Sequence, residues 1–341
     1  MINWISKKTI DNNKVNLLLE KSLESNQFTN YGPNVQLLEK VIKQKLKIND
    51  DKSVIVVNNG STAIQVLTSS IDYFYKKKHQ WATQSFTFPP SAQGNLSNVK
   101  IIDIDLEGGL DLNQLDNSID GIIVTNIFGN IVNIKKYEKW AIDNKKFLIF
   151  DNAATPYTFY NGVNSCNYGN GSTISFHHTK QIGFGEGGAI IVDKNFEKNI
   201  RCLINFGINL TDDYWLKEGN NYKMSDISAV YILQYLDNFD LILNKNLLLY
   251  NYFKSKIPKN IKLFPSFDDG TILPSCLCLL FDNYDDNIRQ KLLKNNIFCR
   301  KYYFPLKETK NTLEIYNKIL CLPCNMDMSI SDIDLIISLI S

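Results

Sequence analysis

The sequence is poor in the residues that build metal centres and disulfide scaffolds. It contains three histidines, which argues against a multi-histidine metal site and leaves a Ser-His-Asp hydrolase few bases to choose from. Its seven cysteines are an odd number and lack the dense spacing of a secreted disulfide domain. Cys321 and Cys324 form a lone C-x-x-C motif that no second pair completes into a zinc site. We therefore expect no metal, and reduced, structural thiols in a cytoplasmic protein.

Net charge and long apolar runs are also scarce. The formal net charge of +2 gives no electrostatic reason to expect a nucleic acid or an anionic membrane as partner. The longest apolar runs, such as residues 276–281, are far too short to span a bilayer, and residues 1–30 lack the pattern of a signal peptide. The composition, with 44% hydrophobic and 21% charged residues, is that of a globular protein with a large core.

Short apolar segments alternate with helical patterns through the first half of the chain. Strands are expected at residues 54–57, 81–88, 100–105, 122–127 and 147–150. Helices are expected at residues 15–25, from 35 onward, 63–75, 91–96 and 134–144. This alternation predicts an α/β fold with a mostly parallel central sheet that helices cover on both faces.

The second half of the chain follows a different pattern. After residue 193 it is mainly helical, with helices expected at residues 196–205, 225–238 and 241–253. From about Pro258 it changes to a strand at 276–281, a helix at 286–295 and a helix at the C-terminus, which indicates a smaller α+β unit. We therefore expect a large domain over residues 1–240 and a small C-terminal domain over residues 241–341.

A lysine stands among glycines between two expected strands, in residues 172–193. Residues 173–176 alternate β-branched or aromatic with polar side chains, and residues 189–192 form a short apolar run. Lys180 lies in the loop between them, which suggests a covalent cofactor lysine or, alternatively, a solvated lysine on a surface hairpin. Gly183, Gly185 and Gly188 formally match the dinucleotide fingerprint, but a strand follows where that motif must open a helix. We therefore reject a dinucleotide site.

Polar residues cluster at the expected carboxyl ends of the strands, the edge where α/β sheets bind ligands. Residues 58–62 join a strand to a helix start, a geometry that offers backbone N–H groups to an anion or forms an ordinary helix cap. A pyridoxal-phosphate site needs an amine, a carboxylate for the pyridinium nitrogen, an anion cradle and a ring that stacks. The sequence offers these in Lys180, Asp151, Gly60-Ser61-Thr62 and Phe88.

Six segments, spread over nearly the whole chain, match the motifs of one enzyme family. They are Thr-Asn-Tyr-Gly-Pro at 29–33, Asn-Gly-Ser-Thr-Ala at 59–63, Ser-Phe-Thr-Phe at 85–88, Asn-Ile-Phe-Gly at 126–129, Ser-Phe-His-His-Thr-Lys at 175–180 with Glu-Gly-Gly at 186–188, and Gly-Asn-Asn-Tyr-Lys-Met at 219–224. With them the chain resembles the sugar-nucleotide aminotransferases of the DegT/DnrJ/EryC1/StrS family. This resemblance implies the fold of pyridoxal-phosphate-dependent transferases of fold type I.

The resemblance also implies a homodimer with shared active sites and roles for individual residues. Lys180 would bind pyridoxal 5'-phosphate as a Schiff base and then shuttle the proton, while Asp151 would pair with the pyridinium nitrogen. The cofactor's ring and phosphate would be held by Phe88, Ala153, Gly60, Ser61, Thr62, Ser175 and, from the neighbouring subunit, Asn221.

Three positions depart from the family pattern. Ala154 stands where the family often has His or Gln, Asn126 replaces a His, and Lys223 replaces an Arg. These departures concern substrate contacts more than cofactor contacts. Five further residues are open candidates for contact with ligand or nucleotide-sugar: His177, Glu186, Tyr214, Trp215 and Arg300.

The function implied by the resemblance is amino transfer, with glutamate as the expected donor. The acceptor would be a 4-keto-6-deoxyhexose linked to dTDP, UDP or GDP, and the product a 4-amino-4,6-dideoxyhexose, because residues 29–33, 126–130 and 300–305 resemble the viosamine-forming branch. Three alternatives stay open: a 3-keto sugar aminotransferase, a non-catalytic sensor or scaffold, and a sugar 3-dehydratase. The last is disfavoured because those relatives carry His in place of the cofactor lysine, whereas this chain has Lys180.

Overall fold

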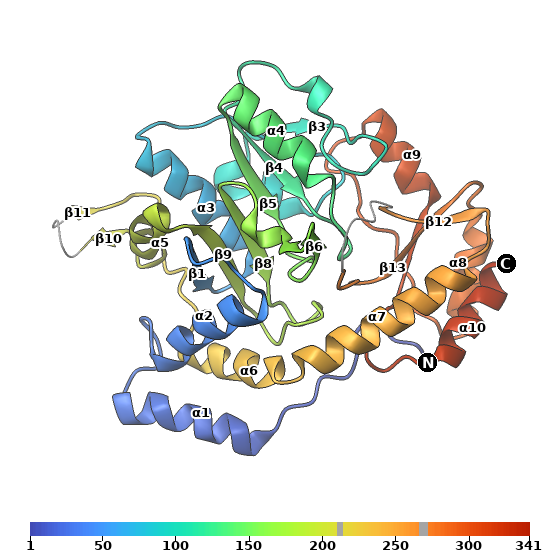
Figure 1. The fold of residues 1–341 in the computed structure, drawn as a ribbon, viewed down its shortest axis with the longest axis horizontal. Coiled ribbons are helices and arrows are strands. Elements are labelled where there is room, and N and C mark those ends of the chain that lie inside the picture. The colour runs from blue at the N-terminus through green and yellow to red at the C-terminus, as the bar shows by residue number, and fades with distance from the viewer. Residues whose placement is uncertain (210–213, 266–271) are drawn as a thin grey trace.

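A computed structural model describes residues 1–209, 214–265 and 272–341 (Figure 1). Its central sheet has seven strands in the order β1-β9-β8-β5-β4-β2-β3. All neighbours from β8 to β3 are parallel, whereas β9 runs antiparallel to both β1 and β8. The strands are β1 (Lys52–Val57), β2 (Trp81–Gln84), β3 (Lys100–Ile102), β4 (Gly121–Thr125), β5 (Phe147–Asp151), β8 (Gly171–Ser175) and β9 (Gly188–Asp193).

Helices cover both faces of this sheet, as the sequence predicts. They are α1 (Asn12–Ser25), α2 (Pro33–Lys45), α3 (Gly60–Phe74), α4 (Ile134–Asn144), α5 (Glu197–Ile204) and α6 (Asp226–Leu236). Successive side chains of β1 point to opposite faces. Val54 and Val56 pack in a core with α2 and α6, while Ile55 and Val57 pack with α3 and α5. Each such fully buried aliphatic side chain contributes about 1.5–3 kcal/mol, so the sheet is held from both sides.

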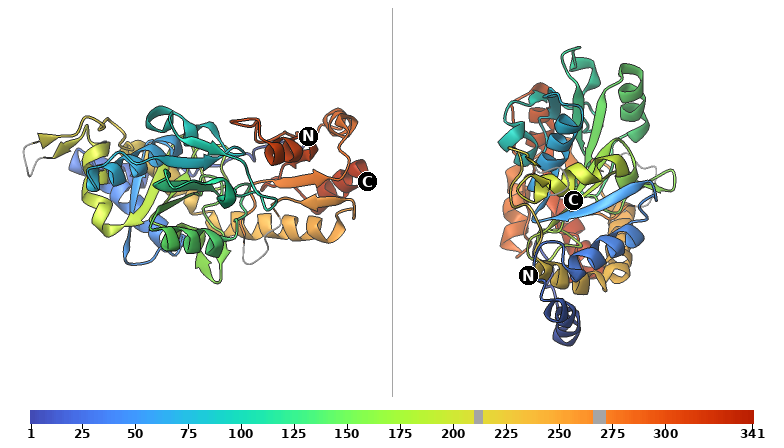
Figure 2. Two further views of the ribbon diagram at one scale, coloured as in Figure 1. Left: turned by 90° about the horizontal axis from the view of Figure 1, so that it is seen from above. Right: turned by 90° about the vertical axis from the view of Figure 1, so that its left-hand side faces the viewer.

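The C-terminal part has its own three-stranded antiparallel sheet, made by β12 (Ile261–Leu263), β13 (Leu277–Phe281) and β14 (Ile319–Leu322). It carries α8 (Asp286–Lys294), α9 (Lys310–Lys318) and α10 (Ile330–Ile340). The long helix α7 (Phe239–Lys256) runs along one side of the molecule and connects the two parts (Figure 2). Leu249 and Phe253 of α7 belong to the C-terminal core, and so does Ile2. The domain division at residues 240 and 241 stays a prediction.

Some expected elements are shorter than the sequence suggested. The strand expected at 81–88 ends at Gln84, because Ser85 turns toward the C-terminal part and its carbonyl accepts the N–H of Leu306 at 2.9 Å. The helix expected at 91–96 is a pair of 3₁₀ turns, Pro89–Ala92 and Gly94–Leu96. Gln93 is extended and Gly94 adopts a φ of 60°, so the backbone leaves the helical conformation between the two turns and a continuous α-helix cannot form. The small hairpin of β6 (Phe159–Tyr160) and β7 (Val163–Asn164) was not predicted.

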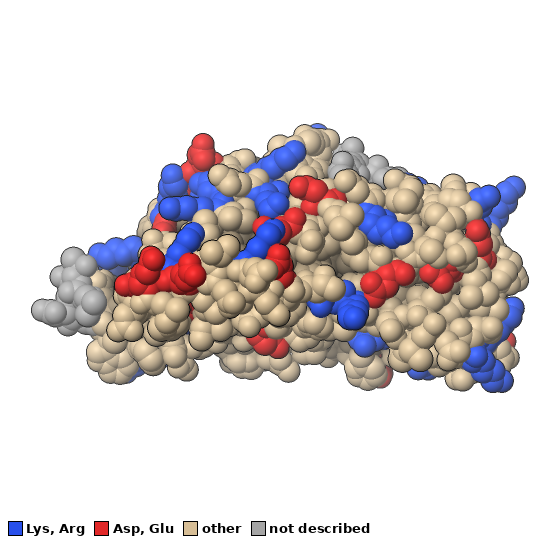
Figure 3. Space-filling model, turned by 90° about the horizontal axis from the view of Figure 1, so that it is seen from below, with Lys and Arg blue, Asp and Glu red and all other residues tan. Residues whose placement is uncertain are grey.

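The surface mixes both signs of charge. On the face shown in Figure 3, Lys and Arg side chains lie beside Asp and Glu side chains. Among the described residues, none of the helices combines the length and apolar character that a bilayer crossing demands.

Candidate active site

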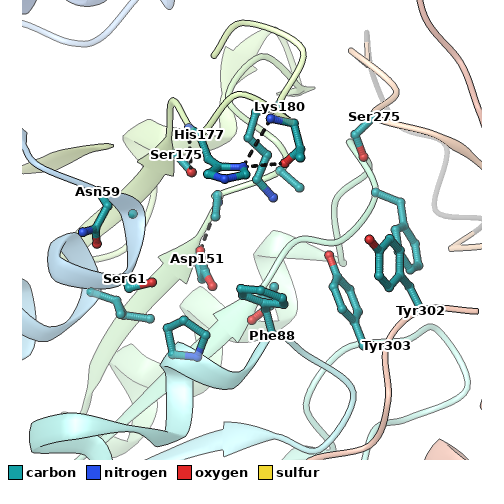
Figure 4. A pocket seen from close by; sticks show the side chains of 18 of the residues that line it. Asn59, Ser61, Phe88, Asp151, Ser175, His177, Lys180, Ser275, Tyr302 and Tyr303 are labelled. Atoms are coloured by element: carbon teal, nitrogen blue, oxygen red, sulfur yellow. Dashed lines mark hydrogen bonds between the residues drawn. The ribbon is translucent and has the colours of Figure 1, made fainter. Parts of the chain in front are cut away.

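A cavity of about 560 Å³ lies at the carboxyl ends of the parallel strands, where the sequence predicted the ligand site (Figure 4). What we call the inner wall is formed by the start of α3, the ends of β5 and β8 and the loop after β8. Its residues are Gly60, Ser61, Asp151, Ser175 and Lys180. The opposite side, here called the outer wall, consists of Trp4, Ser275, Cys276, Tyr302 and Tyr303. The cavity therefore forms where the C-terminal part and the N-terminal segment meet the edge of the large sheet.

Lys180 lies in the loop between β8 and β9, as predicted, and is half-buried in the inner wall. Its backbone N–H donates to the carbonyl of His177 at 2.8 Å. Desolvation lowers the pKa of the Lys180 ammonium, and the nearby Asp151 carboxylate opposes this effect. A desolvated amine with a lowered pKa has a larger neutral fraction, which is the nucleophilic form.

Asp151 ends β5 and is buried beneath the cavity. Its neighbours in parallel register are Thr125 on β4 and Thr173 on β8. The carboxylate accepts the N–H of Ala153 at 3.0 Å and the hydroxyl of Thr173 at 3.3 Å. Desolvation raises the pKa of Asp151, against the lowering effects of these hydrogen bonds and of Lys180. A buried carboxylate in this position suits a cationic partner in the cavity.

The start of α3 has the geometry that the sequence suggested for an anion cradle. Asn59 is the N-cap, and its side chain accepts the N–H of Thr62 at 2.8 Å. A Cβ at Gly60 would lie 2.9 Å from the Cβ of Ser175, so only glycine fits between α3 and β8. The backbone N–H groups of Gly60 and Ser61 belong to the first turn, which has no intrahelical acceptors, so they are free to bind an anion together with the Ser61 and Ser175 hydroxyls.

Gly183, Gly187 and Gly188 near Lys180 serve close packing, whereas Gly185 faces open space and adopts a φ of 65°. A Cβ at Gly188 would lie 2.5 Å from the carbonyl carbon of Asn59. This glycine lets β9 pass directly behind the start of α3, which keeps the cradle close to the Lys180 loop. The rejection of a dinucleotide fingerprint agrees with this geometry, because Gly188 is the first residue of strand β9 and does not open a helix.

Phe88 and Ala153 line the cavity, whereas two other predicted residues lie elsewhere. Thr62 is buried one step further along α3 and is outside the described cavity lining. Asn221 is exposed and forms an isolated antiparallel bridge with Asn205. Asn221 is also outside the described cavity lining. The contacts of Thr62 and Asn221 with a phosphate stay predictions.

The structure separates the open candidates. His177 and Glu186 line the cavity, with His177 Nε2 3.4 Å from Glu186 Oε1, and His177 Nδ1 lies 2.8 Å from the Thr179 hydroxyl. Ala154 also lines it. Asn126 does not reach it: this side chain is fully buried and donates to Asn152 Oδ1 at 2.7 Å.

None of the three residues predicted to contact the nucleotide-sugar is found in the described cavity lining. Trp215 is 67% exposed, and the side chain of Tyr214 lies outside the described residues. Arg300 is outside the described cavity lining but contacts two residues of the outer wall, with its guanidinium carbon 5.0 Å from the ring centroid of Trp4 and 5.5 Å from that of Tyr302. Lys223 donates to Asn205 Oδ1 at 2.8 Å.

Sequence reasoning missed most of the outer wall. Tyr303 stacks on Phe128 with ring centroids 5.1 Å apart, and its own ring lies 6.3 Å from that of Phe88. The sequence singled out Arg300 as a candidate contact of the nucleotide-sugar and residues 300–305 as a segment that resembles the viosamine-forming branch, but it assigned Tyr302 and Tyr303 no role. Trp4 carried no local signal, because only the tertiary fold brings the N-terminus to the cavity.

All seven cysteines lie within the described residues as free, buried thiols, and Cys276 reaches the cavity. Within the described ranges, no group of three or more His, Cys, Asp or Glu side chains is arranged to hold a metal ion.

The fold is that of the pyridoxal-phosphate-dependent aminotransferases of fold type I. A solved structure of a DegT/DnrJ/EryC1/StrS aminotransferase from Brucella abortus matches with a TM-score of 0.84 and 20% identity, over 96% of this chain and 95% of that one. The chain belongs to the DegT/DnrJ/EryC1/StrS aminotransferase family, whose model matches residues 9–341.

Two curated relatives match over nearly their full length. The dTDP-4-amino-4,6-dideoxy-D-glucose transaminase of Shigella dysenteriae is 26% identical over 352 residues, covering 94% of this chain and 93% of the relative. The UDP-4-amino-4,6-dideoxy-N-acetyl-beta-L-altrosamine transaminase of Campylobacter jejuni is 24% identical over 360 residues, covering 96% and 93%. The protein is therefore an aminotransferase, as the sequence motifs predicted.

Proposed function

We propose that this aminotransferase binds pyridoxal 5'-phosphate and aminates C4 of a nucleotide-linked 4-keto-6-deoxyhexose, with glutamate as amino donor. The observation that carries the proposal is the inner wall, where the Lys180 amine, the buried Asp151 carboxylate and the cradle at the start of α3 line one cavity. Its volume of about 560 Å³ falls in the range of small-molecule sites.

The residues present fit the cofactor. Only a glycine at position 60 leaves room between α3 and Ser175, and this room lies beside unpaired backbone donors that suit a phosphate. Asp151 would accept from the protonated ring nitrogen, and Phe88 and Ala153 would lie against the ring. When bound, pyridoxal phosphate supplies an electron sink that stabilises negative charge at the reacting carbon.

The remaining chemistry belongs to the chain's own groups. Lys180 would hold the cofactor covalently and, once displaced by the amino donor, would carry the proton between the reacting carbons. Its desolvated amine, with a lowered pKa, suits both tasks near neutral pH. Asp151 would keep the ring protonated, and the half-enclosed cavity would limit the access of water.

The acceptor is proposed from the relatives. One is named for a dTDP-linked and one for a UDP-linked 4-amino-4,6-dideoxy sugar, which supports amination at C4 and leaves dTDP, UDP and GDP as nucleotides to test. In the described lining of the cavity, the groups that can carry positive charge are Lys180 and His177. The diphosphate of such a substrate would therefore lie beyond the cavity.

We further propose a cytoplasmic homodimer. Asn221 is exposed and outside its own chain's cavity, a placement that supports its predicted contact with the cofactor phosphate of a neighbouring subunit. Lys223, two residues further along, lies on the same segment.

A reconstitution experiment tests the proposal. Purified protein with pyridoxal phosphate should turn yellow, and borohydride should fix the cofactor on the peptide that contains Lys180. Glutamate should then convert the spectrum to that of the aminated cofactor, and one of the dTDP-, UDP- or GDP-linked 4-keto-6-deoxyhexoses should restore it. Product NMR locates the new amine. An amine at C3 would replace our assignment with the 3-amino alternative, a dehydrated product would indicate the dehydratase, and binding without turnover would indicate a scaffold.

A further inference from the structure

The N-terminal segment crosses from the C-terminal part to the loop that carries Lys180. Ile2 pairs with Ile297 in a parallel bridge, and Phe298 donates its N–H to the carbonyl of Ile2 at 3.0 Å. Trp4 then enters the outer wall of the cavity, with its ring centroid 5.6 Å from that of Tyr302. Four residues later, before α1 begins, the chain reaches the Lys180 loop at Lys8.

Lys8 holds both ends of the turn that follows the reactive lysine. Its Nζ donates to the carbonyl of Lys180 at 2.7 Å and also to the carbonyl of Gly183. These two residues already bond to each other, because the N–H of Gly183 donates to the carbonyl of Lys180 at 3.1 Å. One amine thus closes a turn whose first residue carries the side chain that would bind the cofactor.

The Lys8 side chain is packed against the protein and is partly shielded from solvent. The Nζ atom lies 4.5 Å from the ring centroid of Tyr235 on α6, a cation–π distance. Burial lowers the pKa of Lys8 to about 7, an unusual environment for a lysine. Both protonation states retain at least two N–H donors, so the amine can serve the two carbonyls on either side of that pKa.

Other contacts also hold this loop: the N–H of His178 donates to the carbonyl of Gly185 at 2.8 Å, and Gln181 Nε2 donates to the carbonyl of Cys324 at 2.7 Å. Lys8 adds a side-chain link between residues 180 and 183 themselves, so its loss would free the backbone of this turn. A shift of the Lys180 backbone would move the amine at the end of its side chain relative to Asp151 and the cradle. Misplacing a reacting group by about 1 Å can lower a rate by roughly 10²-fold.

We propose that Lys8 is a positioning residue for Lys180: its two hydrogen bonds fix the turn 180–183, so that the reactive amine meets the cofactor in one place. This role rests on the proposed function, which places the cofactor at Lys180. The two hydrogen bonds from Lys8 to the turn 180–183 do not depend on the cofactor. Lys8 would touch neither cofactor nor substrate.

The test compares K8M with K8R and with K7M. Methionine keeps most of the length of Lys8 and removes its donors, whereas arginine keeps the charge and the donors. Lys7 is exposed, and its backbone N–H, not its side chain, donates to Asp327 at 2.7 Å, so K7M is the matched control for charge. Two measurements are made well below the melting temperature: amide hydrogen exchange over residues 181–187 in the cofactor-free protein, and the rate at which Lys180 captures pyridoxal phosphate, followed by absorbance and borohydride trapping.

We expect K8M to speed exchange in this loop and to slow capture, each by about tenfold, as for the loss of a side-chain hydrogen bond of ordinary net strength. In turnover, kcat should fall more than KM changes, K8R should recover part of the capture rate, and K7M should match the wild type. Unchanged exchange in K8M, or a lower melting temperature with unchanged capture, would overturn the proposal. If wild-type Lys180 captured no cofactor, the proposed function would fail, while the exchange comparison would still decide whether Lys8 holds the loop.

Discussion

The two walls of the cavity are built in different ways. The inner wall comes from short segments in which neighbouring residues act together: a helix start with its N-cap, a strand end with its carboxylate, and a glycine-rich loop with its lysine. The outer wall comes from three separate places, Trp4 near the N-terminus, Ser275 and Cys276 before β13, and the pair Tyr302 and Tyr303.

This difference follows from the work that each wall would do. A cofactor has a fixed shape and charge, so the groups that bind it can be supplied by local motifs of known geometry. The sugar and nucleotide differ between members of the family, as the names of the two relatives show. We infer that the inner wall determines the type of reaction and that the outer wall determines which nucleotide-sugar is accepted as substrate.

The largest expected effect lies in the inner wall at Lys180. K180A should lower kcat by at least about 10³-fold, because in the proposed function this lysine is both the covalent attachment and the proton carrier. Turnover of the keto-sugar is measured with saturating pyridoxal phosphate, and circular dichroism checks the fold. An active K180A enzyme would show that another group performs the chemistry, and the proposed function would be wrong.

A smaller loss is expected at Asp151. D151N keeps the size of the side chain but removes its negative charge, so the ring nitrogen would lose its ionic partner, and kcat should fall by roughly 10²-fold. The absorbance of the bound cofactor should change as well, whereas capture at Lys180 should persist. A D151N enzyme with unchanged kcat and spectrum would mean that this carboxylate has a structural role in the turn to Ala153.

The contrast between the walls also explains how far the sequence predicts the molecule. The alternating apolar strands and the helix signals predicted the mostly parallel sheet and both of its helical layers, and α4 and β5 begin and end close to the expected residues. The placement of Gly60, Asp151 and Lys180 around one cavity could be predicted because each stands in a local pattern with a chemical meaning.

What the sequence could not show depends on contacts between distant segments. The expected strand at 81–88 ends early because Ser85 bonds to Leu306, more than two hundred residues away. Asn126 stands at a strand end, as Asp151 does, yet a hydrogen bond to Asn152 draws its side chain into the interior. Trp4 and Lys8 reach the site only because the N-terminal segment pairs with Ile297 and Phe298.

A substitution at Tyr303 tests whether the outer wall affects substrate binding independently of cofactor binding at the inner wall. Y303L removes the ring that stacks on Phe128, and loss of such an aromatic contact should raise KM for the nucleotide-sugar by about two- to tenfold. Y303F is the matched control, because it retains the ring. Cofactor capture by Lys180 should be the same in both variants. If Y303L slowed capture as much as it raised KM, the two walls would act as one unit and the division would be wrong.

The smallest expected effect is on the pH dependence of the unfolding free energy. It arises from Lys8, which lies on the N-terminal segment between Trp4 of the outer wall and the Lys180 loop of the inner wall. The pKa of Lys8 is lowered by desolvation to about 7 in the folded chain, from an ordinary value of 10.5. Between these values the unfolded chain binds one proton more, so this group makes the folded state more stable as pH rises from 7. Tyr235 and His178 are the titratable neighbours; desolvation, followed by the charge of Lys8, lowers the pKa of His178.

We expect the unfolding free energy of the wild type to gain, relative to K8M, at most about 2 kcal/mol between pH 7 and pH 9. Urea unfolding of both proteins at several pH values measures this difference, and taking the difference removes the contribution of groups that titrate alike in both. Parallel stability curves would show that Lys8 titrates at its ordinary pKa and is solvated. The hydrogen bonds from Lys8 to the turn 180–183 would then be absent in solution, and the N-terminal segment would contribute to the cavity only through Trp4.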